Sequence, residues 1–323
     1  MAKIRSHRHG SLAFRPRKRA AELSPRIKTW PAVGEAVPLA FAGFKAGMTR
    51  VALIDDSNSP SKGFEIAVPA TVVETPPLLV YGIRAYVRAA DGTKRVLSDG
   101  LVSDEKLLKP LGLKPNKGME KIEKAAGELI DVSLLAAVQP GKTGVGRKKP
   151  FFVEVGIGGT QEAKLAHAKS LLGKELHARD VFKEGEFVDA IAVSKGKGWQ
   201  GAVKRFGVHL QRRKATGRRR HVGTLGPWHP AKVMYTAPQA GQTGFHRRTQ
   251  LNNRILKIGE KGEEIVPNGG FLRYGVVKNP YILLKGSLIG TRKRLILLRK
   301  SLRLREAKKP EIKFVSTSSM QGG

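Results

Sequence analysis

Residues 190–259 begin with A-I-A-V-S-K-G-K-G-W-Q-G and end with R-R-T-Q-L-N-N-R-I-L-K-I-G. This stretch contains no Asp or Glu, but it holds 15 Lys and Arg, ten Gly and four of the chain's eight His. A segment that builds a core shows a hydrophobic period of about 2 or 3.6 residues, and none continues through residues 211–226. We therefore expect an extended loop that does not fold on itself. Its charge requires an anionic partner, and phosphate backbone fits best.

The whole chain shares this excess of positive charge. Its 323 residues contain 60 Lys and Arg against 26 Asp and Glu, a formal net charge of +34, and 40% are hydrophobic. The hydrophobic fraction suffices for a folded core, so the chain is not a disordered polycation. Such a charge indicates a nucleic-acid partner. A membrane surface is the alternative, but Gly interrupts the basic run, and basic membrane helices need a continuous apolar face.

Several other classes are disfavoured by simple features of the sequence. No segment approaches about 18 uninterrupted apolar residues, so we expect no membrane span. The N-terminus M-A-K-I-R-S-H-R-H-G lacks the apolar core of a signal peptide, which favours a cytoplasmic protein. The chain has no Cys, which excludes disulfides, Cys-based zinc sites and thiol nucleophiles.

From residue 38 the sequence reads as short strands separated by turns. We expect a pair of short strands around Gly43 and Gly47, then strands rich in Val, Ile, Thr and Tyr that are separated by Pro76-Pro77 and Asp91-Gly92. Late strands are expected at residues 187–193, 255–258, 281–284 and 295–298. Closely spaced strands with turn signals favour an antiparallel β-barrel.

Residues 103–186 have a different pattern and predict an α/β insertion. Ser103 can cap a short helix, residues 117–137 carry a second helical pattern, residues 151–155 form a strand, and Thr160 caps a helix that stops at Gly173. The fold class is thus mainly β with an α/β insertion, a long extended loop and a basic N-terminal arm. The expected segments are a basic arm (1–37), a first part of the barrel (38–102), the insertion (103–186), a barrel strand (187–194), the extended loop (195–254), closing barrel strands (255–300) and a frayed C-terminal tail (301–323).

Two motifs resemble parts of enzymes. P-G-K-T at 140–143 resembles the end of a phosphate-binding loop, but Ala136 stands where that motif needs its first Gly. F-V-E-V-G-I-G-G-T at 152–160, together with N-P-Y at 279–281, resembles S-adenosylmethionine-dependent methyltransferases. Such a fold needs alternating strands and helices after the Gly loop, and only one strand follows here. This pattern disfavours an rRNA methyltransferase, which we keep as an alternative function. A free RNA chaperone is the other alternative.

The histidines do not form a catalytic or metal-binding cluster in the sequence. No Asp or Glu lies near those of the basic stretch to orient them, and neither G-x-S-x-G nor H-E-x-x-H occurs. We expect a protein that is not an enzyme, with no catalytic residues, metal or cofactor. The histidines are expected to stack on bases or to contact phosphates.

Three parts of the basic stretch and the N-terminal arm are candidates for RNA contact. S-K-G-K-G-W-Q-G at 194–201 alternates Lys with Gly, which allows backbone to approach phosphates. Q-R-R-K-A-T-G-R-R-R-H at 211–221 is the densest charge cluster. Trp228 lies between Pro227 and His229-Pro230 without apolar periodicity, so we expect it to stack on bases and not to lie in the core. Residues 1–30 contain nine Lys and Arg and one acid, which is typical of an arm that orders on phosphates or remains solvated.

These motifs resemble the ribosomal protein L-three family, which is universal in large ribosomal subunits. The resemblance rests on G-F-K-A-G-M-T-R (43–50), F-V-D-A-I-A-V-S-K-G-K-G-W-Q-G (187–201) and the long run from G-T-L-G-P-W-H-P at 223 to T-Q-L-N at 252. It covers nearly the whole chain. The arm and the insertion resemble the archaeal and eukaryotic branch, and the short C-terminus resembles the archaeal one.

The resemblance implies a translation-protein-type β-barrel on the subunit exterior, with an arm and a loop that run into large-subunit (23S) rRNA. It implies a Trp at the loop tip near the peptidyl transferase centre, which Trp228 matches, and a non-catalytic role in early subunit assembly. The implied partners are this rRNA and neighbouring large-subunit proteins, with no membrane and no homo-oligomer, on cytoplasmic ribosomes. The predicted rRNA-binding residues are Lys3, Arg5, His7, Arg8, His9, Arg15, Arg17, Lys18, Arg19, Lys195, Lys197, Trp199, Arg212, Arg213, Lys214, Arg218, Arg219, Arg220, His221, Trp228, His229, His246, Arg247 and Arg248.

Overall fold

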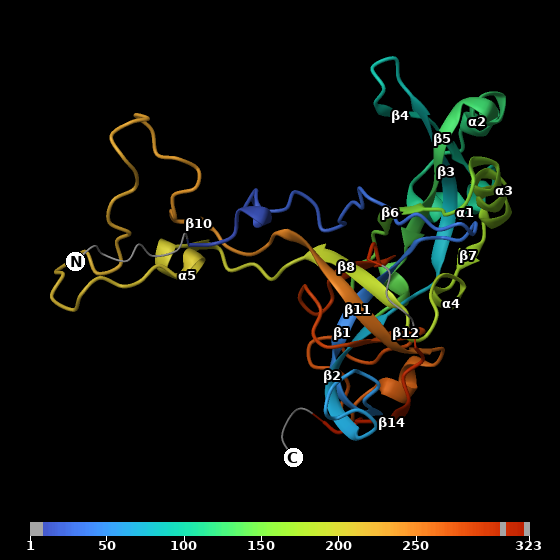
Figure 1. Cartoon of the computed structure of the whole chain (residues 1–323). Coiled ribbons are helices and arrows are strands. Elements are labelled where there is room, and N and C mark those ends of the chain that lie inside the picture. Colours follow the sequence, from blue (N-terminus) through green and yellow to red (C-terminus); the bar gives the residue numbers. More distant parts are fainter. Residues whose placement is uncertain (1–8, 304–307, 320–323) are drawn as a thin grey trace. The chain divides into compact units, whose positions relative to one another are not determined.

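The computed structural model describes residues 9–303 and 308–319 (Figure 1). The chain divides into two compact units. The loop unit comprises the described part of Met1–Ala21 together with Ser194–Arg247, and the β unit comprises the described parts of Glu22–Val193 and Arg248–Gly323.

The first sheet of the β unit has seven strands. They are β1 (Ala40–Ile54), β2 (Glu65–Glu74), β8 (Phe187–Val193), β11 (Arg247–Gly259), β12 (Tyr281–Lys285), β13 (Leu295–Lys300) and β14 (Ile312–Val315). Their order is β13-β8-β11-β12-β2-β1-β14, and β13 also pairs with β1. The hydrogen-bonded pairings therefore lead from β13 through five other strands and return to β13. The registers of β1 with β2 and β13, and of β12 with β2, are antiparallel.

Strand β1 is one long strand, so the predicted pair of short strands around its glycines was wrong. The register with β2 shifts between Lys45 and Gly47, which is a bulge. A Cβ at Gly43 would lie 2.7 Å from the Glu74 carbonyl oxygen, and one at Gly47 would overlap the Phe271 ring. The glycines thus permit close packing along a continuous strand and do not interrupt it.

The second sheet has the order β4-β3-β5-β6, with β7 pairing to β3. Its strands are β3 (Leu78–Arg88), β4 (Lys94–Leu101), β5 (Leu129–Val138), β6 (Phe151–Gly156) and β7 (Glu175–Leu176). The sequence predicts β3 and β4 as strands of the barrel, but in the structure β3 pairs with β4 and β5 in this separate sheet. The insertion supplies the partners of β3, and sequence spacing alone does not reveal such pairings.

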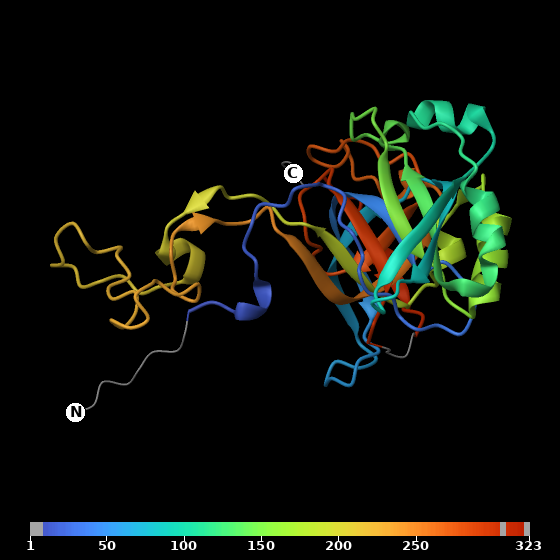
Figure 2. The same ribbon diagram turned by 90° about the horizontal axis from the view of Figure 1, so that it is seen from above.

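The β unit also contains short helices. They are α1 (Glu105–Leu108), α2 (Gly118–Lys124), α3 (Gln161–Leu171) and α4 (Ala178–Val181), and α2 and α3 lie against its strands (Figure 2). Single 3-10 turns occur at Lys109–Leu111, Ala126–Glu128, Pro140–Lys142 and Gly262–Ile265. The helical pattern predicted for 117–137 was wrong after residue 128, because β5 is buried at nearly every position. A continuous apolar run does not distinguish a buried strand from a buried helix.

The larger hydrophobic core cluster contains residues of both sheets, and a smaller one lies on the second sheet. The larger cluster contains Phe41, Phe44 and Tyr281 from the first sheet and Val138 and Phe151 from the second. The rings of Phe44 and Phe151 lie 6.0 Å apart between centroids. The C-terminal tail was predicted to fray, but its residues 312–315 form β14 and pair with β1, and Thr49 Oγ1 donates to the Ser316 carbonyl oxygen. Residues 304–307 and 320–323 of the tail lie outside the described residues.

Candidate nucleic-acid interface

The loop unit is built on a ladder between residues 194–200 and 241–246. Ser194 N donates to His246 O at 2.9 Å, and Lys197 N donates to Thr243 O at 2.9 Å. Further along, β9 (Trp199–Gln200) pairs antiparallel with β10 (Gly241–Gln242). Gly198 and Gly244 both have positive φ, and a Cβ at Gly244 would overlap the Lys195 carbonyl group. Gly198 of the S-K-G-K-G motif and Gly244 of the opposite segment therefore shape the ladder itself.

Arg205 ties the short helix α5 (Ala202–Phe206) to the returning chain. Its Nε donates to Gln242 O at 3.2 Å and its Nη1 donates to Gln239 O at 3.0 Å. Gly241 lies beneath the guanidinium group, where a Cβ would be 2.8 Å from Nη1. Burial lowers the pKa of Arg205, and the positive charge of Arg15 lowers it further. Arg205 is thus a fixed cation that an anion would stabilise.

The N-terminal arm packs on the loop through alternate arginines. In an extended chain, residues two apart point to the same side. The guanidinium carbons of Arg15, Arg17 and Arg19 lie over aromatic rings of the loop. The pairs are Arg15 with Tyr235 at 4.8 Å, Arg17 with Phe206 at 4.2 Å, and Arg19 with Phe245 at 5.4 Å from the ring centroids. These are cation–π contacts.

Backbone hydrogen bonds fasten the same two segments. Ala20 N donates to Phe245 O at 2.8 Å, and the His246 ring Nδ1 lies 2.8 Å from Lys18 O. The arm was expected to order only on phosphates or to remain solvated. In the structure, residues 9–21, including the 3-10 turn Leu12–Phe14, form one compact unit with the loop, whereas residues 22–37 belong to the β unit.

The outer part of the loop has little regular structure. Residues 208–240, all of which the structure describes, form only turns, bends and irregular chain. A few backbone bonds shape the basic cluster, among them Gln211 N to Arg219 O at 2.9 Å and His221 N to Arg218 O at 3.0 Å. Trp228 is 89% exposed and Trp199 is 75% exposed. Neither indole ring lies in the core.

The charge of this unit is not compensated internally. Met1–Ala21 and Ser194–Arg247 contain 19 of the 60 Lys and Arg and none of the 26 Asp and Glu. Within the β unit, by contrast, basic side chains form ion pairs with carboxylates, as in the pairs Arg84–Asp99 and Arg254–Asp56. A surface of one sign repels itself, and an external polyanion would relieve that repulsion.

Most predicted contact residues in the described chain are accessible. His9, Arg15, Arg17 and Arg248 are half-buried, and His246 is buried. The exposed ones are Lys18, Arg19, Lys195, Lys197, Trp199, Arg212, Arg213, Lys214, Arg218, Arg219, Arg220, His221, Trp228, His229 and Arg247. Lys3, Arg5, His7 and Arg8 lie outside the described residues.

Unlike the other predicted residues that the structure describes, His246 is buried, and it contacts the arm from the loop. Its ring contacts Lys18 O, and its backbone N–H donates to Ser194 Oγ at 3.1 Å. Four further residues of this interface, Arg205, Phe206, Tyr235 and Phe245, are not among the residues predicted from the sequence. The alternation of Arg15, Arg17 and Arg19 was the available signal, because it places three cations on one side of an extended chain.

The methyltransferase-like motif has a structural explanation. Strand β6 runs antiparallel to β5, whereas a cofactor-binding doubly wound sheet is parallel. A Cβ at Gly156 would lie 2.6 Å from the Trp30 ring, and one at Gly158 would lie 2.5 Å from Glu35 O. The glycines therefore make room for the segment around residues 30–36 and do not form an open loop for a cofactor.

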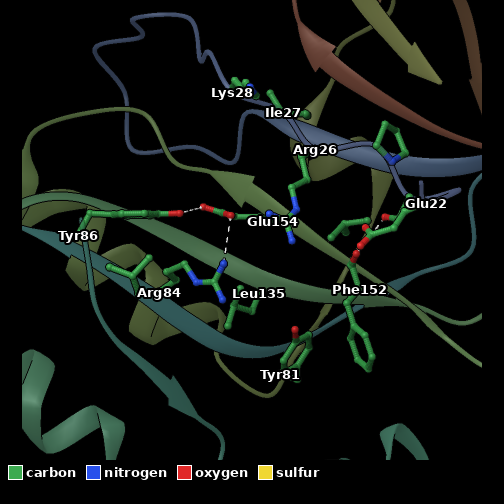
Figure 3. A pocket seen from close by; sticks show the side chains of 14 residues that line it. Glu22, Arg26, Ile27, Lys28, Tyr81, Arg84, Tyr86, Leu135, Phe152 and Glu154 are labelled. Carbon is green, nitrogen blue, oxygen red and sulfur yellow. Dashed lines mark hydrogen bonds and ion pairs between the residues drawn. The ribbon is translucent and has the colours of Figure 1, made fainter. Parts of the chain in front are cut away.

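The acid of the same motif, Glu154, is used within the β unit. It accepts a hydrogen bond from Tyr86 Oη and lies 3.5 Å from Arg84 Nη1 (Figure 3). It also accepts a hydrogen bond from Ser133 Oγ at 2.7 Å. A hollow of about 520 Å³ lies beside it, lined by residues 22, 24–28, 81, 84, 86, 96, 135 and 152–154.

In residues 9–303 and 308–319, no three His, Asp or Glu side chains gather as metal ligands. No helix in these ranges has the length and apolarity needed to cross a bilayer.

The protein is mainly antiparallel β, and its loop unit combines many Lys and Arg with exposed aromatic rings and no Asp or Glu. These are the features of a nucleic-acid-binding protein. The sequence model of the family Ribosomal protein L3 matches residues 1–105 and 113–322, and the chain belongs to this family. The resemblance drawn from the sequence is thereby confirmed.

Relatives of similar length carry the same family name. The chain is 46% identical to the large ribosomal subunit protein uL3 of Methanothermobacter thermautotrophicus, with 100% of both chains covered. It is 47% identical to the uL3 protein of Methanosphaera stadtmanae, again with full coverage, and 45% identical to that of Methanococcus vannielii, covering 98% of this chain and 97% of the relative. These organisms are archaeal methanogens, in agreement with the predicted archaeal branch.

Proposed function

We propose that this protein is a structural component of the large ribosomal subunit and binds large-subunit rRNA through its loop unit. The observation that carries the proposal is the loop unit itself, which has 19 Lys and Arg, no carboxylate and two highly exposed Trp residues. The names of its relatives, large ribosomal subunit proteins, support it. It would act on cytoplasmic ribosomes, beside neighbouring large-subunit proteins, and not as an enzyme.

Within the loop unit we assign two kinds of contact. The exposed cations of residues 212–220 contact phosphates, which anchor the protein without reading sequence. Trp228 and Trp199 are placed to stack on unpaired bases, the usual mode of single-stranded RNA recognition. We keep all the predicted rRNA-binding residues except His246 as rRNA contacts in this proposal.

We further propose that the ring of strand pairings in the first sheet is a translation-protein-type barrel that remains on the subunit exterior. Its support is the return of the pairings to β13 through β1. From this body the arm and loop would enter rRNA, with Trp228 toward the peptidyl transferase centre. Such penetration into folded rRNA requires early joining during assembly.

The salt dependence of rRNA binding tests the proposal. If the loop unit neutralises about 6–10 phosphates, affinity should fall about 10³- to 10⁵-fold between 50 and 200 mM monovalent salt. Replacing Arg218, Arg219 and Arg220 together with Ala should reduce the slope of log affinity against log salt. Replacing the exposed Lys114, Lys117 and Lys121 of the β unit with Ala is the matched control. Equal slopes for both triple variants would contradict the assignment.

Two further measurements address the alternatives. Titration with S-adenosylmethionine should show no binding, because the chain's own residues fill the space beside the glycines at 156, 158 and 159. Co-sedimentation with large subunits through high salt should persist for a structural component and be lost for a free RNA chaperone.

A further inference from the structure

A hollow of about 630 Å³ lies inside the loop unit, between the arm and the loop. Arm residues 15–18 line one side, and residues 205, 206, 233–235, 237, 239 and 240 line the other. Its volume is within the range of about 300–1,000 Å³ that is usual for small-ligand sites. Because the unit contains no Asp or Glu, no side chain of the unit opposes an anion there.

Two guanidinium groups give the hollow its positive charge. Arg205 is held by the carbonyl oxygens of Gln239 and Gln242, so its position is fixed. The buried Nε of Arg15 has no hydrogen-bond partner among the described residues. The charge of Arg15 also disfavours the cationic form of Arg205. A bound anion near the two guanidinium groups would stabilise both cations through its charge.

The remaining lining is aromatic and apolar. The Tyr235 ring is 65% exposed although the Arg15 guanidinium lies 4.8 Å from its centroid. Val233 and Met234 beside it are also exposed. A flat ring that stacks on an aromatic side chain gains from such a surface, and thioether groups pack well against aromatic edges.

We propose that this hollow binds a single nucleotide of the RNA chain that is turned out of its stack. Its phosphate lies between Arg15 and Arg205, and its base stacks on Tyr235 beside Met234. The inference rests on the proposed rRNA binding and deepens it from a charged surface to a discrete site. An acidic peptide would match the cations but would leave the exposed ring unused, whereas a nucleotide matches both.

Crosslinking identifies the class of the occupant. The full-length protein carrying Tyr235→p-benzoylphenylalanine is assembled into large subunits and irradiated. We expect a crosslink to one rRNA nucleotide. The control, Phe64→p-benzoylphenylalanine, replaces an exposed aromatic residue of the β unit and should not reach that nucleotide. A crosslink to a protein, no crosslink, or crosslinks scattered over many nucleotides would each overturn the proposal.

Chemical probing measures the stack itself. In subunits with Tyr235→Leu, the base of the crosslinked nucleotide should become more reactive toward the chemical probe. The ratio of unstacked to stacked base should rise by about 5- to 150-fold. Tyr235→Phe keeps the ring and should leave the reactivity unchanged. If Tyr235→Leu binds rRNA normally and no base changes, the nucleotide site is wrong while the proposed function stands. If the unaltered protein fails to bind rRNA, the proposed function fails, and the site with it.

Discussion

Arg299 donates from Nη2 to Asp189 Oδ2 at 2.7 Å, and both side chains are buried. The other carboxylate oxygen, Oδ1, accepts from Asn252 N at 3.0 Å, and Arg299 Nη1 donates to Thr29 O at 2.5 Å. One ion pair and its hydrogen bonds therefore join β8, β11, β13 and the chain at Thr29. A buried pair of this kind favours one arrangement of these segments, since breaking it would leave a charge without a partner.

Replacing Asp189 with Ala should strongly destabilise the protein. The substitution leaves the Arg299 cation buried and removes the acceptor of Asn252 N, so we expect a loss of about 3–5 kcal/mol in the free energy of unfolding. Urea unfolding of the full-length protein measures it. Glu260→Ala is the control, because Glu260 pairs with Arg179 at an exposed site and should cost no more than about 1 kcal/mol. Similar losses in both variants would show that the Asp189 pair has no special role.

The pair of lysines around Asp131 should make stability depend on pH. Burial raises the pKa of Asp131, but Lys94 Nζ at 2.6 Å and Lys164 Nζ at 2.9 Å outweigh it, and the net pKa lies below the usual value. A carboxyl whose pKa is lowered in the folded state stabilises the fold at pH values above its unfolded-state pKa of about 3.9. This stabilisation is lost as the pH falls through the folded-state pKa.

Asp131→Asn should therefore destabilise the protein at pH 7, and the difference from the unaltered protein should shrink as the pH falls below about 4. Thermal unfolding of both proteins between pH 7 and pH 3 checks this. A difference that stays constant over this range would exclude the ionised carboxylate as its source.

The arm should protect the loop from proteolysis in the absence of RNA. Replacing Arg15, Arg17 and Arg19 together with Gln removes three cation–π contacts, each worth about 0.5–1 kcal/mol at exposed sites. We expect faster cleavage of residues 208–240 by a protease that does not require basic residues. Replacing the same three arginines with Lys keeps the three positive charges, and this variant should be cleaved more slowly than the Gln variant. Unchanged cleavage in the Gln variant would mean that the arm does not hold the loop.

The sequence predicted those parts of the fold whose signals are local. The strands at 151–155, 187–193, 281–284 and 295–298 were found because short apolar runs are bounded there by turn residues, and the structure confirms them. The helix after Thr160 was found from its cap position and from Gly173. By contrast, β5 was taken for helix because its apolar run is continuous. The partners of β3 could not be predicted, since pairing depends on contacts between distant segments.

The same division applies to the candidate site. The missing carboxylates and the absent apolar period indicated a loop outside the core, and the exposure of Trp228 agrees with this. The roles of His246 and Tyr235 depend on the arm, which is more than 200 residues away in sequence. Sequence composition describes the charge of a segment, but it does not show which of its residues a distant segment covers.

Trp228→Ala should impair tRNA-related function more than it impairs incorporation into subunits. The exposed cations of the loop distribute binding over many phosphates, so the loss of one indole ring, worth about 1–3 kcal/mol if it stacks on a base, leaves the protein anchored. The rRNA at the loop tip should nevertheless loosen. Replacing Arg218, Arg219 and Arg220 together with Ala should have the opposite effect and weaken incorporation itself. Occupancy in purified large subunits and aminoacyl-tRNA binding to those subunits separate the two outcomes. If Trp228→Ala abolished incorporation, this side chain, although 89% exposed in the free protein, would be an anchor and not a contact confined to the tip.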